Sequence, residues 1–565
     1  MSRKLVLLVA LLPIIQVYSA NVNWWEDTFI YQVYPRSFKD SNGDGIGDLN
    51  GITSKLEHLK ALNVSGFWIS PIFVSPMVDF GYDIANFTDI DPTFGTLKDF
   101  SALVAKAKSL NLKVILDFVP NHSSDKHPWF QKSIQRIKPF DDYYVWRDAK
   151  MVNGTRHPPN NWLSVFHGSG WTWNEQRKQY YFHQFTPQQP DLNYRSPALY
   201  QAMKDVLTFW TDRGVDGFRV DAIIHVFEDA RFLDEPAIPN TGLPVGHYET
   251  LNHIYTRNQN ETYTLVNDWR KHLDSRPGGK KILMTESYTG LQTLPSSMKY
   301  YTAGADVPFN FMLISNLNNR STPLDFKRAI DGWLNIVPAG YQANWVVDNH
   351  DNNRATTRFG RKRADQIIML AAILPGVGVI YYGNEIGMED TWLSWNETVD
   401  PVGCNAGPEK YYLTSRDPER TPMQWNNSTS AGFSTNKTTW LRVNPNYKTL
   451  NLAAQLNDKY SHYSVFKRLV DLKMSSKIKN ASTEVIIVGE HVLGVRRKSG
   501  NVITALLINF RDLTIPVYAA GWMNLPEIMT IYTTNHEWMI PPGSTLNTTL
   551  FNIPPSGSII LQSNG

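Results

Sequence analysis

The chain carries near its middle the stretch Gly214-Val215-Asp216-Gly217-Phe218-Arg219-Val220-Asp221-Ala222. This pattern is typical of a turn that leads into a buried parallel strand and ends in charged residues. Arg219 and Asp221 are two positions apart, so on a strand both side chains point to the same side. A guanidinium favours the ionised form of a neighbouring buried carboxylate, which keeps that carboxylate available as a nucleophile. A structural salt bridge is the alternative, and this stretch alone does not decide between the two.

Strand-like and helix-like segments alternate on both sides of this stretch. Further strands are expected at 29–33, 67–70, 114–119, 281–286, 343–351 and 377–382. Helical segments lie between them; Thr96 is the expected N-cap of one, and Ser196-Pro197 begins another. Repeated units of a buried strand and a helix predict an α/β fold with a parallel sheet and helices outside. A (β/α)8 barrel accommodates this number of units, and its catalytic residues lie at the carboxyl ends of the strands.

Two parts of the chain interrupt or follow this alternation. Residues 121–195 are rich in Pro, Trp, Tyr and Asn, and the segment is too long for an ordinary loop. From about residue 480, strand-like segments follow one another without helices. We therefore expect a barrel at 21–120 and 196–479, an irregular subdomain inserted after the third strand at 121–195, and a C-terminal antiparallel β-domain at 480–565.

Composition excludes some classes of function. The 565 residues have a net charge of +3, so charge gives no case for a nucleic-acid partner or an acidic membrane surface. The content of aromatic residues is 12%, with 18 Trp and 26 Tyr. A large core explains part of this content. Flat aromatic rings also suit the apolar faces of sugars.

The N-terminus predicts a secretory signal at residues 1–20. Arg3 and Lys4 precede the apolar stretch Leu5–Ile15, and small residues follow as far as Ala20. The apolar stretch is short and contains Pro13, which argues against a transmembrane helix. No later stretch reaches spanning length.

Eleven expected N-glycosylation sequons also indicate secretion. They begin at Asn63, Asn86, Asn153, Asn260, Asn319, Asn396, Asn426, Asn427, Asn436, Asn480 and Asn547. Asn121 matches the pattern too, but it lies near the expected pocket and is expected to remain unmodified. Cys404 is the single cysteine, so no intramolecular disulfide can form.

Four acidic residues stand near the ends of expected strands: Asp117, Asp221, Glu286 and Asp351. A barrel brings these ends together around one pocket. Two carboxylates that flank a glycosidic bond are the minimum needed to hydrolyse it. His122 and His350 lie beside two of the acids and are suited to bind sugar hydroxyls.

These residues stand in motifs that resemble the α-amylase family of retaining glycoside hydrolases. In chain order the motifs are Asp117-Phe118-Val119-Pro120-Asn121-His122, Gly217-Phe218-Arg219-Val220-Asp221, Thr285-Glu286-Ser287 and Asn349-His350-Asp351. Gln189-Pro190-Asp191-Leu192-Asn193 and the segment 416–425 resemble the oligo-1,6-glucosidase and α-glucosidase branch. With its signal and sequons, the chain is similar to insect members of that branch.

The resemblance implies three catalytic residues. Asp221 would be the nucleophile, Glu286 the general acid and base, and Asp351 the residue that stabilises the distorted sugar. It also implies six residues that bind the first glucose: Tyr82, Asp83, His122, Arg219, His350 and Arg416. Arg416 is expected to neutralise Asp83, although Arg420 is close enough in sequence to leave that choice open.

The activity implied is that of a secreted, exo-acting α-glucosidase. Its expected partners are small oligosaccharides, namely maltose, sucrose and short α-1,4-linked chains; the oligomeric state is left open. Ala222 beside the nucleophile goes with α-1,4 preference in the family. An isomaltase or sucrose-specific hydrolase of the same branch is one alternative. A catalytically silent relative that serves as a receptor or transporter subunit is another.

A metal site is expected in the loop Asp40–Asp48. Its oxygen-bearing residues alternate with small ones: Asp40, Asn42, Asp44, the Ile46 carbonyl and Asp48. Ca²⁺ prefers several oxygen ligands of this kind. The loop resembles the start of an EF-hand, although Gly51 occupies the place of the usual glutamate. A glycine-rich loop without metal is the alternative; if Ca²⁺ binds, its role is structural.

Overall fold

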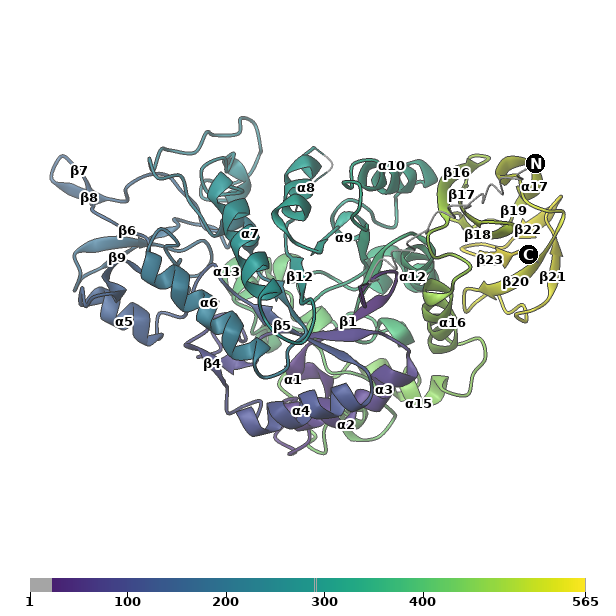
Figure 1. Ribbon diagram of the computed structural model, residues 1–565, viewed down its shortest axis with the longest axis horizontal. Helices are drawn as coiled ribbons and strands as arrows, with labels where there is room; N and C mark the ends of the chain where they lie inside the picture. Colours follow the sequence, from purple (N-terminus) through teal and green to yellow (C-terminus); the bar gives the residue numbers. More distant parts are fainter. Residues whose placement is uncertain (1–22, 289, 291, 564–565) are drawn as a thin grey trace, which may run out of the picture.

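The computed structural model describes residues 23–288, 290 and 292–563. The predicted signal segment, residues 1–20, lies outside the described residues. Figure 1 shows a central barrel with one smaller body at each end.

The barrel is an eight-stranded parallel sheet with the strand order β13-β12-β11-β5-β2-β1-β15-β14. The strands are β1 Phe29–Val33, β2 Gly66–Ile69, β5 Lys113–Phe118, β11 Gly217–Val220, β12 Ile282–Thr285, β13 Val307–Pro308, β14 Asn344–Val346 and β15 Val377–Tyr381. The predicted (β/α)8 barrel is therefore confirmed. Seven strands coincide with predicted segments, and β13 was not recognised because it is only two residues long.

Asn344 closes the barrel between β13 and β14. Its side-chain Oδ1 accepts a hydrogen bond from Asn310 N at 2.7 Å, and its Nδ2 donates to Pro308 O at 2.6 Å and to Tyr301 Oη at 3.1 Å. Val346 N also donates to Asn310 O at 3.3 Å. A buried side-chain amide thus supplements the backbone contacts where β13 and β14 meet.

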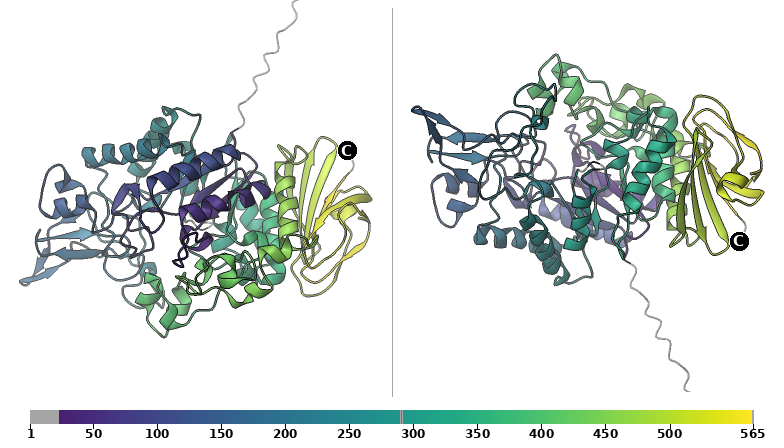
Figure 2. Two further views of the ribbon diagram at one scale, coloured as in Figure 1. Left: turned by 90° about the horizontal axis from the view of Figure 1, so that it is seen from below. Right: turned by 90° about the horizontal axis from the view of Figure 1, so that it is seen from above.

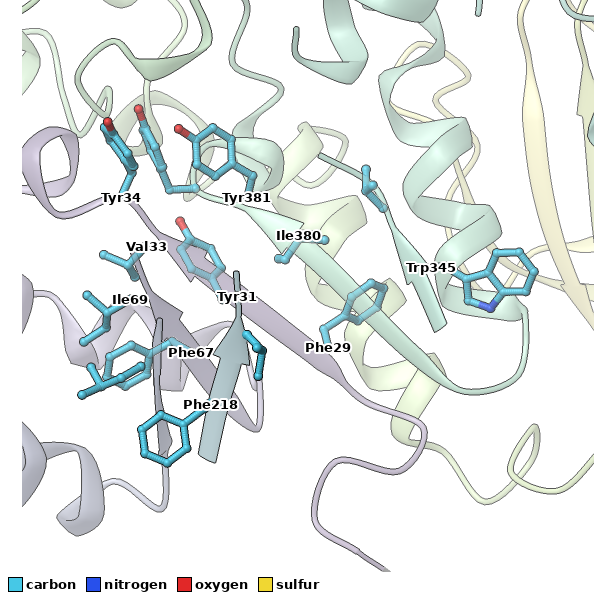
Figure 3. Close-up of a cluster of buried hydrophobic side chains, with 14 of the residues drawn as sticks. Phe29, Tyr31, Val33, Tyr34, Phe67, Ile69, Phe218, Trp345, Ile380 and Tyr381 are labelled. Atoms are coloured by element: carbon cyan, nitrogen blue, oxygen red, sulfur yellow. The ribbon is translucent and has the colours of Figure 1, made fainter. Parts of the chain in front are cut away.

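Both faces of the strands are buried, which explains their nearly continuous apolar sequences. In β1, Tyr31 and Val33 belong to the core layer between the strands and the outer helices (Figure 3). Ile30 belongs to a separate cluster with Trp68 and Ile115 from the neighbouring strands. Since side chains alternate along a strand, this second cluster fills the barrel interior.

Helices surround the barrel. The longer ones are α4 Leu97–Ser109, α6 Pro197–Thr211, α7 Asn260–Asp274, α8 Leu294–Ala303, α10 Pro323–Leu334, α12 Ala364–Ile373 and α16 His462–Met474. Shorter ones are α1 Pro35–Phe38, α2 Leu49–Ser54, α3 Leu56–Ala61, α9 Met312–Ser315, α11 Ala355–Phe359, α13 Pro401–Ala406, α14 Tyr411–Thr414 and α15 Leu452–Gln455. Thr96 forms the predicted N-cap of α4, in a capping box with Asp99.

The inserted segment after β5 forms a small body at one end of the molecule (Figures 1 and 2). It contains α5 Pro128–Ile134, a sheet of β6 Trp146–Arg147, β10 Gln179–Phe182 and β9 Trp171–Asn174, and a hairpin of β7 Lys150–Val152 and β8 Thr155–His157. Trp162, Trp171 and Phe182 belong to a core of its own.

The C-terminal part forms the predicted antiparallel β-domain at the opposite end (Figure 2). Its main sheet contains, in spatial order, β16 Ser482–Val488, β17 Val492–Ser499, β18 Val502–Asn509, β23 Ser558–Gln562, β20 Ile528–Thr534 and β21 Thr545–Asn547. A second pair of strands, β19 Ile515–Val517 and β22 Phe551–Ile553, and helix α17 Ala519–Met523 complete it. Buried Asp365 of α12 joins the domain to the barrel, because its carboxylate bonds His462 of α16 and His536 beyond β20.

The Asn344 contacts between β13 and β14 predict that removing this side chain destabilises the protein. Asn344→Ala leaves Asn310 N–H and Pro308 C=O without their buried partners, at a cost of about 1–3 kcal/mol for each group. We expect a lower free energy of unfolding in denaturant titrations followed by circular dichroism. Exposed Asn335, the C-cap of α10, offers the control substitution Asn335→Ala. Equal stability of the two variants would contradict the role of Asn344.

Candidate active site

Four predicted acids lie together at the carboxyl ends of the barrel strands. Asp117 is on β5, Asp221 directly follows β11, and Glu286 directly follows β12. Asp351 lies in the turn after β14. Because parallel strands end at the same rim of a barrel, acids far apart in sequence converge there.

Arg219 holds three of these carboxylates at once. Its Nη1 lies 2.9 Å from Asp117 Oδ1 and 2.5 Å from Asp221 Oδ1, and its Nη2 lies 2.8 Å from Glu286 Oε1. The register of β11 with β5 pairs Arg219 with Asp117, which explains the first contact. The Arg219 side chain is 1% exposed, so these charges interact with little screening by solvent.

Protonation in this cluster follows from burial and from an excess of negative charge. Burial, and then the neighbouring acids Asp221 and Asp351, raise the pKa of Glu286 to about 8, against the effect of Arg219. Burial and the nearby Asp117 raise the pKa of Asp221 to about 7, again against Arg219. Glu286 therefore holds its proton to the higher pH, which suits a general acid.

Ala222 links the two central acids through the backbone. Its N–H donates to Glu286 Oε2 at 2.8 Å. Its backbone is left-handed, with φ 44° and ψ 31°, which is uncommon for a residue other than glycine. Such conformations are concentrated at functional sites. This conformation aims the N–H at the Glu286 carboxyl group.

Asp351 lies in a second charge network. Its Oδ1 accepts from Arg416 Nη1 at 3.2 Å and from Arg420 Nη2 at 3.0 Å. Arg416 also bonds Asp79 at 2.8 Å and Asp400 at 2.6 Å. Burial raises the pKa of Asp351, but His350 and the two arginines outweigh it and hold that pKa well below its usual range.

One predicted substrate contact is wrong. Arg416 pairs with Asp79, and Asp79 rather than Asp83 lines the pocket. The Asp83 carboxylate accepts hydrogen bonds from the N–H groups of Val78 and Asp79 and from the Ser75 hydroxyl. Asp83 therefore holds the turn that presents Asp79. A close pair of aspartates in one short turn does not reveal which one faces the pocket.

Tyr82, His122, His350 and Arg416 line the same pocket, whereas Arg219 lies behind its acids Asp221 and Glu286. His350 stacks on Tyr82 with ring centroids 5.2 Å apart, and its Nδ1 is 2.8 Å from Gln32 Nε2. His122 Nε2 lies 3.1 Å from Gln189 Nε2. Burial lowers the pKa of His122 to about 3 and lowers that of His350 as well, so both rings are neutral near pH 7.

These residues enclose a cavity of about 710 Å³. The inserted segment contributes one side of its mouth through Val165, Phe166, His167 and Phe185. The region after β11 contributes the adjoining part through Ala222, Ile224, His225, Tyr248, Glu249 and Arg257. Except for Ala222, these mouth residues were not singled out from the sequence, because they lie in loops without a strong local pattern.

Side-chain oxygens of the predicted metal loop accept hydrogen bonds from the loop's own backbone amides. Asp40 Oδ1 accepts from Asn42 N and Gly43 N, Asn42 Oδ1 accepts from Asp44 N, and Asp44 Oδ1 accepts from Ile46 N. Buried Asp48 caps α2 by accepting from Gly51 N. Among the described residues, no Lys, Arg or His nitrogen forms an ion pair with Asp40, Asp44 or Asp48. The loop thus collects acidic groups that form no direct ion pair, although the Lys39 charge acts on Asp40 and Asp48 from nearby.

A second collection of oxygens lies where the inserted segment joins the barrel. Asn121 Oδ1, Asp191 Oδ2 and Glu228 Oε1 are buried without a hydrogen-bond partner among the described residues. Burial, followed by the neighbouring acid Glu228, raises the pKa of Asp191, and burial raises the pKa of Glu228 to about 7. Oxygens of neighbouring buried acids that lack a hydrogen-bond partner are of the ligand type that Ca²⁺ prefers. Sequence reasoning missed this group because its members lie far apart in the chain.

Comparison with known proteins identifies relatives over most of the chain. Residues 32–482 match the family model for the α-amylase catalytic domain. An α-glucosidase of Apis mellifera is 49% identical over 514 residues, which covers 91% of this chain and 90% of the relative. Maltase 1 of Drosophila virilis is also 49% identical, over 90% of this chain and 82% of the relative. The crystal structure of the α-glucosyl transfer enzyme XgtA superposes with a TM-score of 0.85 at 33% identity, covering 96% of this chain and all of that one.

A relative of a different kind bears on the silent-relative alternative. The human amino acid transporter heavy chain SLC3A1 is 39% identical over 474 residues, covering 82% of this chain and 67% of the relative. Within the described residues, none of the helices combines the length and the apolar character needed to cross a membrane.

Proposed function

The chain belongs to the α-amylase family, and on this premise we propose that it is an α-glucosidase that acts by a retaining double displacement. The observation that carries the proposal is the pair Asp221 and Glu286, both held by Arg219 in one pocket. Similarity to insect α-glucosidases and maltases supports the same conclusion. The intact acids favour this reading over a silent receptor or transporter subunit.

In the first step, a carboxylate oxygen of Asp221 attacks the anomeric carbon of the glucose. Glu286 gives its proton to the glycosidic oxygen, so the leaving sugar departs as an alcohol. The product is a covalent glucosyl ester on Asp221. Asp351, which remains ionised, stabilises the positive charge that develops on the sugar ring.

In the second step, Glu286 takes a proton from water, and the water oxygen attacks the anomeric carbon, whose bond to the Asp221 oxygen breaks. Glucose leaves with its original anomeric configuration, and Asp221 regains its carboxylate. Asp79, Arg416, His122 and His350 hold the hydroxyls of this glucose, and Tyr82 supplies an apolar ring face. Because both histidines are neutral near pH 7, each can donate one hydrogen bond and accept another.

We further propose that the protein is secreted and N-glycosylated. Eight of its sequons begin with an exposed asparagine: Asn63, Asn153, Asn260, Asn319, Asn396, Asn427, Asn480 and Asn547. Asn121 is fully buried, which supports the expectation that it is unmodified.

Two structural Ca²⁺ sites complete the proposal. The loop Asp40–Asp48 supplies Asp40, Asn42, Asp44, the Ile46 carbonyl and Asp48. The second group supplies Asn121, Asp191 and Glu228, beside the substrate-binding His122. When bound, a cation would neutralise acids that form no direct ion pair with a Lys, Arg or His side chain among the described residues. The second ion would also fix the inserted segment against the barrel.

A substrate panel tests the activity. We expect purified protein to release glucose readily from maltose and sucrose and slowly from isomaltose, because Ala222 beside Asp221 goes with α-1,4 preference. Starch should react very slowly, because the loops at the mouth suit short chains. Asp221→Asn should fold but lose about 10⁴-fold or more in kcat, since an amide cannot form the glycosyl ester. Near-normal turnover of this variant, in a preparation checked for deamidation, would remove Asp221 from the mechanism.

The raised pKa of Glu286 predicts that the alkaline limb of the pH–activity profile lies at a higher pH than an ordinary glutamate would give. As pH rises through about 8, Glu286 loses the proton that it must donate, and kcat/KM for maltose should fall. Glu286→Gln should remove this limb when the substrate is a 2,4-dinitrophenyl α-glucoside, whose leaving group needs no proton. A limb that persists in the variant would assign the titration to another group.

Metal analysis tests the two Ca²⁺ sites separately. We expect two Ca²⁺ ions per chain, and we expect Asp44→Ala and Glu228→Gln each to lose one. Chelation should lower Tm, because binding to the folded state alone contributes about 2.7 kcal/mol at 100 times Kd. Asp89→Asn, at an exposed acid outside both groups, serves as the control. Protein that is free of Ca²⁺ when purified without chelator, and that does not take it up, would refute both sites.

A further inference from the structure

Two histidines and a glutamate gather at the mouth of the pocket. His167 lies in the inserted segment, whereas His247 and Glu249 lie in the long loop between β11 and α7. One ligand atom from each residue lies within 4.8 Å of the others. The two imidazole rings stack with centroids 4.3 Å apart. This group is separate from both proposed Ca²⁺ sites.

The group is accessible and chemically ready to bind an ion. His167 and Glu249 are exposed and His247 is half-buried, so an ion can enter and the side chains can rotate. Partial burial and the neighbouring His247 lower the pKa of His167, which leaves its ring neutral near pH 7. Its Nδ1 accepts only a long hydrogen bond, 3.3 Å from Tyr248 N. A metal that binds this nitrogen would therefore replace a weak contact.

The donor set selects the class of ion. Two imidazole nitrogens and one carboxylate suit borderline divalent ions such as Zn²⁺ and Cu²⁺, whereas Ca²⁺ prefers a shell of oxygens. Zn²⁺ binds nitrogen at about 2.0–2.1 Å, so the ligand atoms need only a modest approach from their present separation. Three protein ligands leave a further position for water.

An ion at this point would join the two sides of the mouth. His167 and Glu249 both line the catalytic cavity, next to Phe166 and Tyr248 respectively. The two loops already touch through a backbone hydrogen bond of 2.8 Å from Gly168 N to Gly246 O. A metal bridge from His167 to His247 and Glu249 would lock this contact beside the sugar entrance.

We propose that His167, His247 and Glu249 form a binding site for a transition-metal ion of the Zn²⁺ class, and that the bound ion inhibits the enzyme by locking the two touching loops together beside the pocket mouth. Metal binding stands independently of the hydrolytic activity. The inhibitory effect rests on the proposed α-glucosidase function.

The test uses full-length, glycosylated protein saturated with Ca²⁺, and Zn²⁺ is the probe. Isothermal titration calorimetry measures Zn²⁺ affinity, and initial rates with maltose measure inhibition. His247→Gln is the decisive variant, because His247 does not line the cavity. His157→Gln, at an exposed histidine on β8 of the inserted segment, is the matched control. Thermal melting checks that each variant folds.

We expect wild type and His157→Gln to bind one Zn²⁺ at this site and to be inhibited over the same concentration range. His247→Gln should bind at least 10-fold more weakly, and its inhibition curve should shift by the same factor. Glu249→Gln, at an exposed position, should also weaken binding and serves if His247→Gln fails to fold. Equal Zn²⁺ affinity in wild type and both site variants would overturn the site. Binding that depends on His247 without inhibition would overturn the proposed inhibition by locked loops. Protein without any glucosidase activity would refute the proposed function, and calorimetry would still decide the metal site.

Discussion

One guanidinium group surrounded by three carboxylates is the constraint on which the candidate active site depends. Arg219 cannot balance Asp117, Asp221 and Glu286 together, so the buried cluster carries an excess of negative charge unless it retains a proton. This imbalance helps to keep Glu286 protonated, which suits the proposed role of general acid. In the same pocket, Arg416 and Arg420 contact the Asp351 carboxylate, and Asp351 therefore stays ionised. One pocket thus holds carboxylates in opposite protonation states.

The sequence predicted the fold well where the elements are long and apolar. Seven barrel strands and the capped helix α4 have clear periodicity or a clear start signal, so local pattern was sufficient. The eighth strand, β13, has only two residues and no pattern to recognise. Its existence depends on neighbours, because β12 and the Asn344 side chain hold it in place. Tertiary contacts of this kind are invisible in a single sequence.

The candidate site was predictable to the extent that its chemistry sits in contiguous motifs. Strand ends located the acids, and the family resemblance supplied their roles. Prediction from the sequence failed where geometry decides between two nearby residues, since Asp79 faces the pocket while Asp83 holds the turn. It also missed Glu228, which meets Asp191 only in the folded chain. Residues that act through spatial convergence need the structure.

The pairing of β1 with β15 has a consequence for how the protein is made. Phe29 pairs with Gly378, so the first barrel strand acquires its second neighbour only after about 350 further residues have been synthesised. At about 5–20 residues per second, one edge of β1 waits for tens of seconds on the ribosome. An unpaired apolar strand edge can join other chains. We therefore expect early packing partners or chaperones to shield β1 until about two-thirds of the 565 residues have been synthesised.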